Sequence, residues 1–485
     1  MLQKLTIQRT AIIVLFMLLL AMATRIPTDT DMYWHLGSAR HIVEEGGLFY
    51  GDPFSHTVPG GYRVNFDWGS QLILYALWQL GGLTAMMLFT AITAIFGMYL
   101  IYRTMPPNPY LNAMILVLAT AAAAVFWSPR PQMMTHLFTC VTVFLVYRYK
   151  WQGKDWLWLF VPMMLLWGNM HAGYIVGFII FGGMIAGEVL NILVQPNKVT
   201  NVGWSGICKM VMVGVVAAAV LIINPYGADL YIVPFNTFGL QVLRDYIQEW
   251  QRPILTQPAV LPYTAMLILT PLSMILSRRR LDISELILLL GTGYLSITVA
   301  RNIALFAVVA APILARHLND VFQKRGWVVN AVQQPSRMMI RLNVLIIVIV
   351  GMGLLLNIVN NALPKVQEKA LEAVVPVQAV EFIKAHDYEG EIFNSYNWGG
   401  YLIFYLPESP VFIDGRTDLY GDALVEQYAS IALGREEPDA VFDTYSIGYV
   451  LVENGSGIDN NLREKVGWDR VYEDDLAVIY VKAET

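Results

Sequence analysis

The chain has 485 residues, of which 56% are hydrophobic and only 14% are charged. Soluble globular proteins carry about 25% charged residues, so this composition excludes a purely soluble protein, whose surface could not be hydrated. Residues 361–485 hold 9 Lys and Arg against 23 Asp and Glu, so this part is net −14, the rest is net +9, and the whole chain is −5. An acidic domain repels phosphates, which excludes nucleic acid as a partner.

The charge asymmetry predicts two domains, a membrane-embedded body over 1–360 and a soluble extracytoplasmic α/β domain over 361–485. The two cysteines, Cys140 and Cys208, lie in or at the end of apolar runs. They predict no disulfide framework and indicate no redox compartment.

Apolar segments predict an α-helical polytopic membrane protein with about eleven spans. The candidates are 11–24, 83–102, 111–127, 132–147, 156–170, 172–193, 208–223, 259–276, 283–300, 302–315 and 343–360. A further apolar segment, Trp68–Leu80, is long enough for only about 20 Å of helix, against a hydrocarbon core of roughly 30 Å. We predict that it lies along the membrane interface.

The basic residues predict the orientation of the spans. With eleven spans, the cluster Arg278, Arg279 and Arg280 faces the cytoplasm, as the positive-inside rule requires. Counting Trp68–Leu80 as a span would place this cluster outside. The sequence therefore predicts an integral protein of the bacterial plasma membrane, with a cytoplasmic amino terminus and an extracytoplasmic carboxyl-terminal domain.

A long first outer loop, 25–67, is expected to carry function, because loops of this length seldom lack one. Within it, Asp31–Glu45 can form a helix with Trp34, Leu36, Ile42 and Val43 available to the membrane. A second long outer stretch, Asn224–Pro258, predicts an interfacial loop with helix near Leu240–Trp250.

Strand and helix patterns alternate after Asn360. The segments GEIFN, PVFID and GYVLVEN predict strands, and Arg470–Lys482 predicts a closing hairpin. Pro376 marks a helix start, and Asp422 can cap another helix. Asp414, Arg416 and Asp418, in FIDGRTDLYG, either bind a sugar or acceptor or form a tight hydrogen-bonded turn.

Two carboxylates, Asp29 and Asp31, stand just outside the first span. An aspartate between lipid and water can act as a general base toward an acceptor hydroxyl or amine, or a DxD pair can hold a divalent cation, Mg or Mn, over a diphosphate. The alternative is structural: Asp31 caps the helix that starts there, and Asp29 belongs to a polar turn.

The basic residues of the predicted outer face before residue 360 are all arginines. They are Arg25, Arg40, Arg63, Arg130, Arg244, Arg252 and Arg301. The planar guanidinium group suits phosphate or carboxylate, so these arginines predict an anionic-ligand site, although pairing with lipid phosphates explains each one as well. His171 and Glu249-Trp250 are on the same predicted face. An enzymatic site requires these groups to converge with the two carboxylates.

Several motifs resemble the GT-C glycosyltransferase superfamily over most of the chain. They are DTDMYWHLGSARHIVEEGGLFYGDPFSHTVPGG, WGSQLILYALWQLGG, SPRPQ, NMHAG, SITVARNIALFAVVAAPILA and FNSYNWGGYLIFYLPESPVFIDGRTDLYGD. The superfamily includes protein O-mannosyltransferases, the lipid A aminoarabinose transferase and oligosaccharyltransferase catalytic subunits. The resemblance implies a GT-C-like membrane domain with juxtamembrane helices and a polyprenyl-phosphate-linked sugar donor.

Carried onto this chain, the resemblance implies inverting sugar transfer on the outer face, with Asp31 as the catalytic base and Asp29 as its partner and candidate metal ligand. Arg130, Arg301 and Arg63 are candidates for the donor phosphate. The candidates for substrate contact are His35, Trp34, His171 and Glu249. The partners are the lipid-linked donor, membrane lipids and an acceptor that the sequence does not identify.

Two other functions stay open. One is a noncatalytic GT-C-like subunit of a membrane complex, and the other is a transporter of a lipid-linked substrate. Transporters usually bury charged groups near the bilayer midplane. The acidic residue well inside a predicted span is Glu188, which we expect to reach the inner interface near Lys198.

Overall fold

The computed structural model describes residues 5–196, 202–327, 335–386 and 388–483. The chain divides into two compact units. We call Met1–Arg25, Met87–Gly227 and Gln248–Asn361 the helical unit, and Ile26–Met86, Ala228–Ile247 and Ala362–Thr485 the sheet unit. One boundary between them falls at residues 361 and 362, and the first loop belongs to the same unit as the carboxyl-terminal part.

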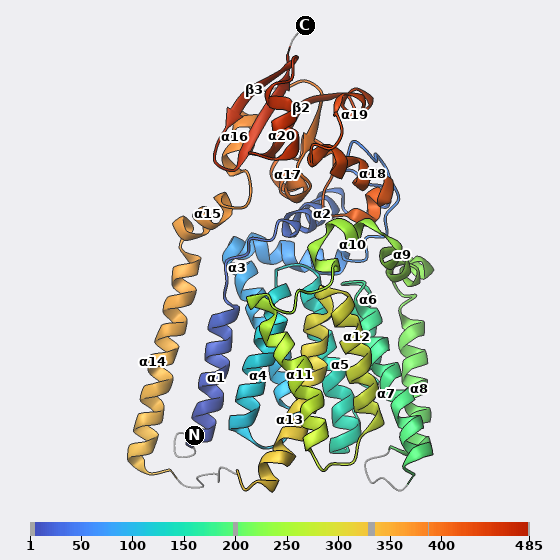
Figure 1. Cartoon of the computed structure of the whole chain (residues 1–485), viewed down its shortest axis with the longest axis vertical. Coiled ribbons are helices and arrows are strands. Elements are labelled where there is room, and N and C mark those ends of the chain that lie inside the picture. The colour runs from blue at the N-terminus through green and yellow to red at the C-terminus, as the bar shows by residue number, and fades with distance from the viewer. Residues whose placement is uncertain (1–4, 197–201, 328–334, 387, 484–485) are drawn as a thin grey trace. The chain divides into compact units, whose positions relative to one another are not determined.

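The helical unit is a bundle of apolar helices (Figure 1). Its helices are α1 (Ile7–Ala23), the second arm of α3 (Trp68–Tyr102), α4 (Pro109–Ala123), α5 (Gln132–Gln152), α6 (Phe160–Gly168), α7 (Tyr174–Val194), α8 (Gly203–Val220), α11 (Leu261–Leu276), α12 (Ile283–Thr298), α13 (Ile303–Lys324) and α14 (Arg337–Ala362). Short 3-10 turns include η2 (Ala124–Phe126), η3 (Leu157–Leu159), η5 (Gln248–Trp250), η6 (Pro258–Val260) and η7 (Ala300–Asn302).

All eleven predicted apolar segments are helical in the structure. Within the described residues, seven helices are long and apolar enough to cross a membrane: Trp68–Tyr102, Pro109–Phe126, Tyr174–Val194, Gly203–Val220, Pro258–Leu276, Ala300–Lys324 and Arg337–Ala362. The other predicted segments correspond to the shorter apolar helices Ile7–Ala23, Leu157–Gly168 and Ile283–Thr298, and to α5. The chain is an integral, polytopic membrane protein.

The segment Trp68–Leu80 continues into α3 but is separated from the rest of that helix by a kink. The backbone leaves helical geometry at Gly81 and Gly82, and Gly82 has a φ of 52°. Only glycine adopts this left-handed conformation at little cost, so the Gly-Gly pair determines where the helix bends. The interfacial position of the first arm stays a prediction.

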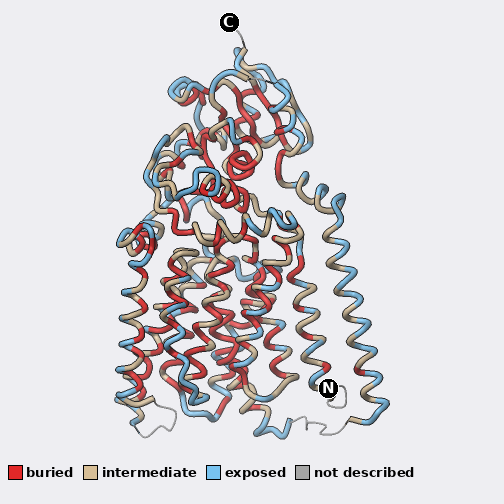
Figure 2. The backbone as a smooth tube through the Cα atoms, turned by 180° about the vertical axis from the view of Figure 1, so that it is seen from behind, coloured by how far each residue is buried: buried red, intermediate tan, exposed pale blue. Residues whose placement is uncertain are grey.

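Burial distinguishes the helices of the bundle (Figure 2). Of the most apolar stretch of α13, 72% is buried inside the protein, whereas only 6% of the corresponding stretch of α14 is buried. Helix α14 is apolar on all sides, which suits contact with lipid around most of its circumference. It contacts α1 through polar groups, since Asn357 Oδ1 accepts from Thr24 Oγ1 at 2.7 Å and Asn343 Nδ2 donates to the Leu5 carbonyl at 2.9 Å.

The Glu188 side chain of α7 is fully buried and forms an ion pair with Lys150 of α5. Lys198 lies outside the described residues, so the predicted position of Glu188 near the inner interface stays a prediction. The Lys150 ammonium also donates to Asp282 Oδ1 at 2.6 Å and to Ser284 Oγ at 3.0 Å. Because three acceptors take up its three donors, the cluster ties α5, α7 and the start of α12 together.

The sheet unit contains a four-stranded mixed sheet in the order β1-β2-β4-β3. The strands are β1 (Glu391–Asn394), β2 (Ile447–Glu453), β3 (Trp468–Glu473) and β4 (Ala477–Lys482). Strand β1 pairs parallel with β2, and β4 pairs antiparallel with both β2 and β3. The predicted α/β class, two of the three predicted strands and the closing hairpin are confirmed.

The sheet unit contains helices as well. They are α2 (Asp31–Glu45), the first arm of α3, α9 (Val233–Gly239), α10 (Val242–Tyr246), α15 (Pro364–Glu372), α16 (Val377–Lys384), α17 (Gly399–Tyr405), α18 (Thr417–Ala432), α19 (Asp439–Thr444) and α20 (Gly457–Arg463), with the 3-10 turn η8 (Tyr396–Trp398). Asp422 was predicted to cap its own helix. It accepts instead from the backbone N–H groups of Gln241 and Val242 at the start of α10.

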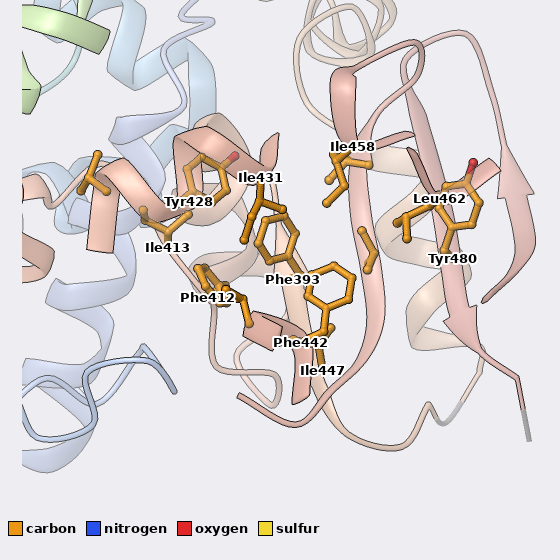
Figure 3. Packing of buried hydrophobic residues seen from close by; sticks show 14 of the residues in the cluster. Phe393, Phe412, Ile413, Tyr428, Ile431, Phe442, Ile447, Ile458, Leu462 and Tyr480 are labelled. Carbon is orange, nitrogen blue, oxygen red and sulfur yellow. The ribbon is translucent and has the colours of Figure 1, made fainter. Parts of the chain in front are cut away.

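The segment PVFID is not a strand, contrary to prediction. Val411 forms a single parallel bridge with Ser55 of the first loop, and Phe412 and Ile413 are fully buried. These side chains belong to a core with Phe393 and Tyr428 (Figure 3). The apolar run therefore reflects burial in the core, which a short strand and a buried loop share.

Helix α2 begins and ends as predicted, but its apolar side chains face protein. Trp34, Leu36 and Ile42 are buried, and only Val43 is exposed. The cause is α17, which packs closely against α2: Arg40 donates to the backbone carbonyls of Phe404 at 3.0 Å and Ile403 at 3.1 Å. The predicted membrane-facing stripe is thus a packing surface within the sheet unit.

Candidate active site

The predicted site residues fall into two groups, one within each unit. Asp29, Asp31, Trp34, His35 and Arg63 belong to the sheet unit. Arg130, His171, Glu249 and Arg301 belong to the helical unit.

Asp31 is the first residue of α2, and Asp29 shapes the turn before it. The Asp31 backbone N–H donates to Asp29 Oδ1 at 3.1 Å, and the Met32 N–H donates to the Asp29 carbonyl at 3.3 Å. Asp29 thus satisfies one of the unpaired N–H groups at the helix start. Asp29 thus has the structural role in the turn that the sequence offered for it, while the Asp31 carboxylate lies at Gly415.

The Asp31 carboxylate lies against the backbone of Gly415. A Cβ atom at position 415 would overlap Asp31 Oδ1 and would lie 2.9 Å from Asp31 Cγ. Gly400 of α17 approaches the same helix start, because its Cβ would lie 2.8 Å from the Thr30 carbonyl oxygen. Two glycines of the carboxyl-terminal part therefore allow the close approach that surrounds Asp31.

Tyr396 also lies within reach of the Asp31 charge. Burial raises the pKa of the Tyr396 phenol above its usual range, and the negative charge of Asp31 raises it further. The Tyr396 hydroxyl is 2.7 Å from Thr417 Oγ1, two residues after Gly415. Tyr396 is therefore a neutral hydroxyl group near the carboxylate.

Arg63 connects the first loop to the segment after Gly415. Its Nε donates to Asp418 Oδ2 at 2.8 Å, and its guanidinium carbon is 5.2 Å from the Trp34 ring centroid and 5.3 Å from the Phe66 ring centroid. A cation over two aromatic faces is stabilised by their quadrupoles. In the described residues the indole N–H of Trp34 is buried and makes no hydrogen bond.

His35 lies in the interior of the sheet unit. Its side chain is 4% exposed, and Nδ1 is 3.3 Å from Gln71 Nε2. Gln71 in turn accepts from Asn65 Nδ2 at 2.8 Å. This position gives His35 a supporting role behind Trp34, and its predicted contact with substrate stays a prediction.

The turn Asp414–Arg416 is a buried ion-pair network. Arg416 is 2% exposed and donates through Nε and Nη2 to both carboxylate oxygens of Asp414, at 2.8 and 2.6 Å, and also binds Asp52. Burial opposes ionisation of Asp414, but Arg416 outweighs it and holds the pKa of that carboxyl below its usual range. The structure therefore supports the hydrogen-bonded turn for Asp414 and Arg416.

The group in the helical unit starts from Arg130, which lies between Pro129 and Pro131. The prolines restrict the backbone on both sides of Arg130, and α5 begins directly after them. Arg130 Nη2 donates to Glu249 Oε1 at 2.6 Å, and Nε donates to Ser128 Oγ at 3.0 Å. Both charged side chains are partly buried.

Arg301 approaches the same group from η7. Its guanidinium carbon is 4.6 Å from the Trp250 ring centroid, and the Ala300 N–H donates to the Gln251 carbonyl at 2.9 Å, which joins the two loops. Burial opposes ionisation of Glu249, yet Arg130 and Arg301 outweigh it and hold the pKa of that carboxyl below its usual range. Glu249 is therefore a counter-charge for the two arginines.

His171 completes this group as a neutral donor. Its Nδ1 accepts from the Gly173 N–H at 2.9 Å and is 2.8 Å from Thr135 Oγ1. Because Nδ1 accepts, the ring hydrogen is on Nε2. Burial, together with the charges of Arg301 and Arg130, lowers the pKa of His171 to about 3. Two arginines, one carboxylate and a neutral imidazole have a net charge of +1.

The lowered pKa of His171 predicts a pH dependence of stability. The unfolded chain binds a proton at His171 near pH 6.5, while the folded chain stays neutral there down to about pH 3. Acid therefore favours the unfolded state. We expect wild-type protein to lose more thermal stability than His171→Gln between pH 7.5 and 5, measured by melting in detergent. Parallel losses would contradict the neutral imidazole.

No three-ligand metal centre is present in the part of the chain that the structure describes, since it contains no group of three or more His, Cys, Asp and Glu side chains. Asp29 accepts the Asp31 N–H, and Asp31 lies on Gly415. Two carboxylates can hold Mg or Mn only where substrate oxygens supply further ligands, so the predicted cation stays a prediction.

No family model and no curated protein matches the chain. Solved structures do. The archaeal oligosaccharyltransferase AglB from Archaeoglobus fulgidus, in complex with an inhibitory peptide and a dolichol-phosphate, matches with a TM-score of 0.57 and 12% identity over 91% of this chain and 69% of that chain. ArnT from Cupriavidus metallidurans bound to undecaprenyl phosphate matches with a TM-score of 0.54 and 12% identity over 97% of each chain.

The chain has the GT-C fold. A second structure of ArnT from Cupriavidus metallidurans, in the apo state, matches with a TM-score of 0.53 and 14% identity over 96% of this chain and 95% of that chain. The predicted GT-C fold class is confirmed. At this identity the likeness establishes the fold, and the argument for function rests on the site residues.

Sequence reasoning missed Gly415, Gly400 and Tyr396 as members of the Asp31 group. The quoted segment FNSYNWGGYLIFYLPESPVFIDGRTDLYGD contains all three, yet only its charged residues were considered. A glycine between two charged residues, as in Asp-Gly-Arg, was the available signal, because such a glycine often permits a close backbone approach.

Proposed function

We propose that the chain is a membrane glycosyltransferase that transfers a sugar from a polyprenyl-phosphate-linked donor to an acceptor at the extracytoplasmic face. The observation that supports it most is the group of Arg130, Arg301 and His171, which is net positive with Glu249 included. It occurs on a fold shared with AglB and ArnT, whose solved structures contain a dolichol-phosphate and undecaprenyl phosphate.

In the proposed reaction, Asp31 acts on the acceptor. Its carboxylate removes the proton from an acceptor hydroxyl or amine, and the acceptor atom then attacks the anomeric carbon. The bond from that carbon to the donor phosphate oxygen breaks as the acceptor attacks from the opposite face, and this single displacement inverts the configuration. The predicted contact of Trp34 with substrate stays a prediction, since its indole N–H is buried and makes no hydrogen bond in the described residues.

The helical-unit group acts on the leaving phosphate. As the glycosidic bond breaks, the bonding electrons move to the phosphate oxygen, and the polyprenyl phosphate leaves with an additional negative charge. Arg130 and Arg301 offset that charge. The neutral His171 ring donates a hydrogen bond to the phosphate through Nε2–H and keeps its proton. Glu249 orients Arg130. Arg63, bound to Asp418, belongs with the Asp31 group in this scheme.

The proposal routes no step through a divalent cation, since the described residues contain no three-ligand group and a cation would need oxygens from the substrate. A cation held partly by substrate oxygens would make transfer sensitive to EDTA. We expect EDTA to change the transfer rate by less than about twofold. Loss of transfer in EDTA, with recovery when Mg or Mn is added, would show that a cation is needed.

The transporter alternative would draw on the buried Lys150, Glu188 and Asp282 cluster. Its ammonium donors are already used by Glu188, Asp282 and Ser284. This internal pairing favours a structural role. A noncatalytic subunit would have the same fold, so activity decides between it and the enzyme.

A vesicle experiment tests the proposed function. The purified chain is reconstituted into vesicles of phosphatidylethanolamine and phosphatidylglycerol with radiolabelled undecaprenyl-phosphate hexoses and a cell-envelope acceptor fraction. We expect acceptor-dependent release of undecaprenyl phosphate. Movement of intact donor between leaflets would support the transporter instead. Neither cleavage nor movement, with a stoichiometric copurifying partner, would support the noncatalytic subunit.

Loss of Arg301 is expected to weaken donor use. In Arg301→Gln the guanidinium over Trp250 is removed, and a charge-assisted hydrogen bond to phosphate contributes about 1.5–3 kcal/mol. The donor KM should rise by about 10- to 100-fold in the vesicle assay. Arg252→Gln, an exposed arginine of the same unit, serves as the control and should keep the KM. Equal effects of both variants would contradict the assignment.

A further inference from the structure

The carboxyl-terminal part of the sheet unit surrounds the Asp31 carboxylate from one side. The three heavy atoms nearest a Cβ built at Gly415 all belong to the Asp31 carboxylate: Oδ1, Cγ and Oδ2. Gly415 follows Phe412 and Ile413, which are fully buried in the core of the domain (Figure 3). The backbone at Gly415 is therefore anchored by packing and cannot easily move away from the carboxylate.

The residues after Gly415 are held just as firmly. Arg416 is buried between Asp414 and Asp52, and Tyr420 donates to Asp414 Oδ2 at 2.5 Å. Thr417 lies 2.7 Å from the Tyr396 hydroxyl. The turn thus presents a firmly held, bare backbone at Gly415 to Asp31, and the Tyr396 hydroxyl is bonded to the same turn through Thr417.

Helix α2, which begins with Asp31, is fixed to the same domain. A Cβ at Gly37 would lie 2.6 Å from Ile403 Cγ2, and a Cβ at Gly400 would lie 3.3 Å from the Trp34 backbone nitrogen. Arg40 adds hydrogen bonds to two α17 carbonyls. Glycines on both helices let α2 and α17 approach closely, so the position of Asp31 follows the position of the domain.

We propose that the carboxyl-terminal domain completes the catalytic site, with Gly415 and Tyr396 as positioning residues that fix the Asp31 carboxylate for proton removal from the acceptor. This inference rests on the proposed function. Gly415 acts by having no side chain, which leaves room for the Asp31 carboxylate directly against its backbone. Tyr396 acts through its hydroxyl, which is 2.7 Å from Thr417 Oγ1 and so holds the backbone that follows Gly415. The carboxyl-terminal domain therefore orients Asp31, the proposed base.

The main test is Gly415→Ala in the full chain. The added methyl group has to displace the Asp31 carboxylate, and a displacement of about 1 Å can cost 10²-fold in rate. We expect kcat to fall by about 10²-fold in the undecaprenyl-phosphate hexose assay, with the donor KM unchanged. The matched control is Gly47→Ala, since a Cβ there meets nothing within 4 Å, and its kcat should stay at the wild-type value.

A folded Gly415→Ala protein with wild-type kcat would overturn the proposal. If Gly415→Ala does not fold, Tyr396→Phe decides, because it removes only the hydroxyl. A kcat at least about 10-fold lower supports the proposal, and a wild-type kcat overturns it. Tyr480→Phe is its control, since it loses a buried hydroxyl bonded to Asp459 at 2.5 Å in the same domain and should keep kcat.

A stability cycle tests the contact even if no donor is used. Gly415→Ala should lower the melting temperature by several degrees in wild type, because overpacking is destabilising. The loss should disappear in Asp31→Ala, which removes the three atoms in contact. An equal loss in both backgrounds would refute the contact. If wild-type protein transfers no sugar but the stability loss disappears in Asp31→Ala, the proposed function is refuted and the contact stands.

Discussion

Asp31→Asn is expected to lower sugar transfer by about 10²- to 10⁴-fold, the usual contribution of a positioned general base. Asparagine has nearly the same shape as aspartate, so the contact with Gly415 and the start of α2 are retained. What is lost is the acceptor for the proton. The expected effect is therefore on kcat, because the variant keeps the arginines of the helical unit that we propose for the donor phosphate.

The measurement is release of undecaprenyl phosphate by reconstituted protein, with donor KM and kcat determined separately. Glu44→Gln is the matched control, because it removes a carboxylate from the exposed face of the same helix. Unchanged kcat in a folded Asp31→Asn protein would remove the catalytic role of Asp31. A rise in donor KM with unchanged kcat would assign Asp31 to binding instead.

The helices could be predicted because the membrane imposes a simple rule. A span needs about 20 consecutive apolar residues, and every predicted segment was helical. The environment of an apolar helix face was harder to predict. Trp34 and Ile42 were expected to face the membrane and are buried against the sheet unit. Lipid and protein interior both select apolar side chains, so periodicity does not distinguish them.

The charged residues showed the same limit of local reasoning. Glu188 was expected near Lys198, 10 positions later, and its ion pair with Lys150, 38 positions earlier in the chain, was not predicted. Asp422 was expected to cap its own helix and caps α10, 181 positions earlier. A carboxylate takes whichever donor the fold brings to it, and the sequence indicates only the nearby ones.

The candidate site was predictable in its residue types but not in its surroundings. Arg130 and Glu249 were both singled out, and their ion pair appeared only in the structure. Gly415 carries no chemical signal of its own, and it contacts Asp31 from the other end of the chain. Such contacts depend on tertiary packing of segments far apart in sequence.

The second large effect is expected for Arg416→Met, which should destabilise the sheet unit by about 3–5 kcal/mol, the usual result of removing one partner from a buried ion pair. Arg416 is 2% exposed and compensates both Asp414 and Asp52. Methionine fills much of the same volume, so the loss comes mainly from charge. Unfolding of the full chain by urea in detergent, followed by tryptophan fluorescence, provides the measurement. Arg435→Met, which changes an exposed arginine of the same unit, should unfold like wild type.

The pH dependence of this variant separates charge from packing. In wild type Arg416 holds the pKa of Asp414 below its usual range, so the stability from this pair is present at neutral pH and is lost as the pH falls through the folded pKa. In Arg416→Met the buried Asp414 and Asp52 have no cation, and burial raises the pKa of both carboxyls. The folded variant then binds protons more readily than the unfolded chain and gains stability as the pH falls. The two unfolding curves should therefore converge between pH 7 and about 4, whereas a defect of packing would keep them apart at every pH.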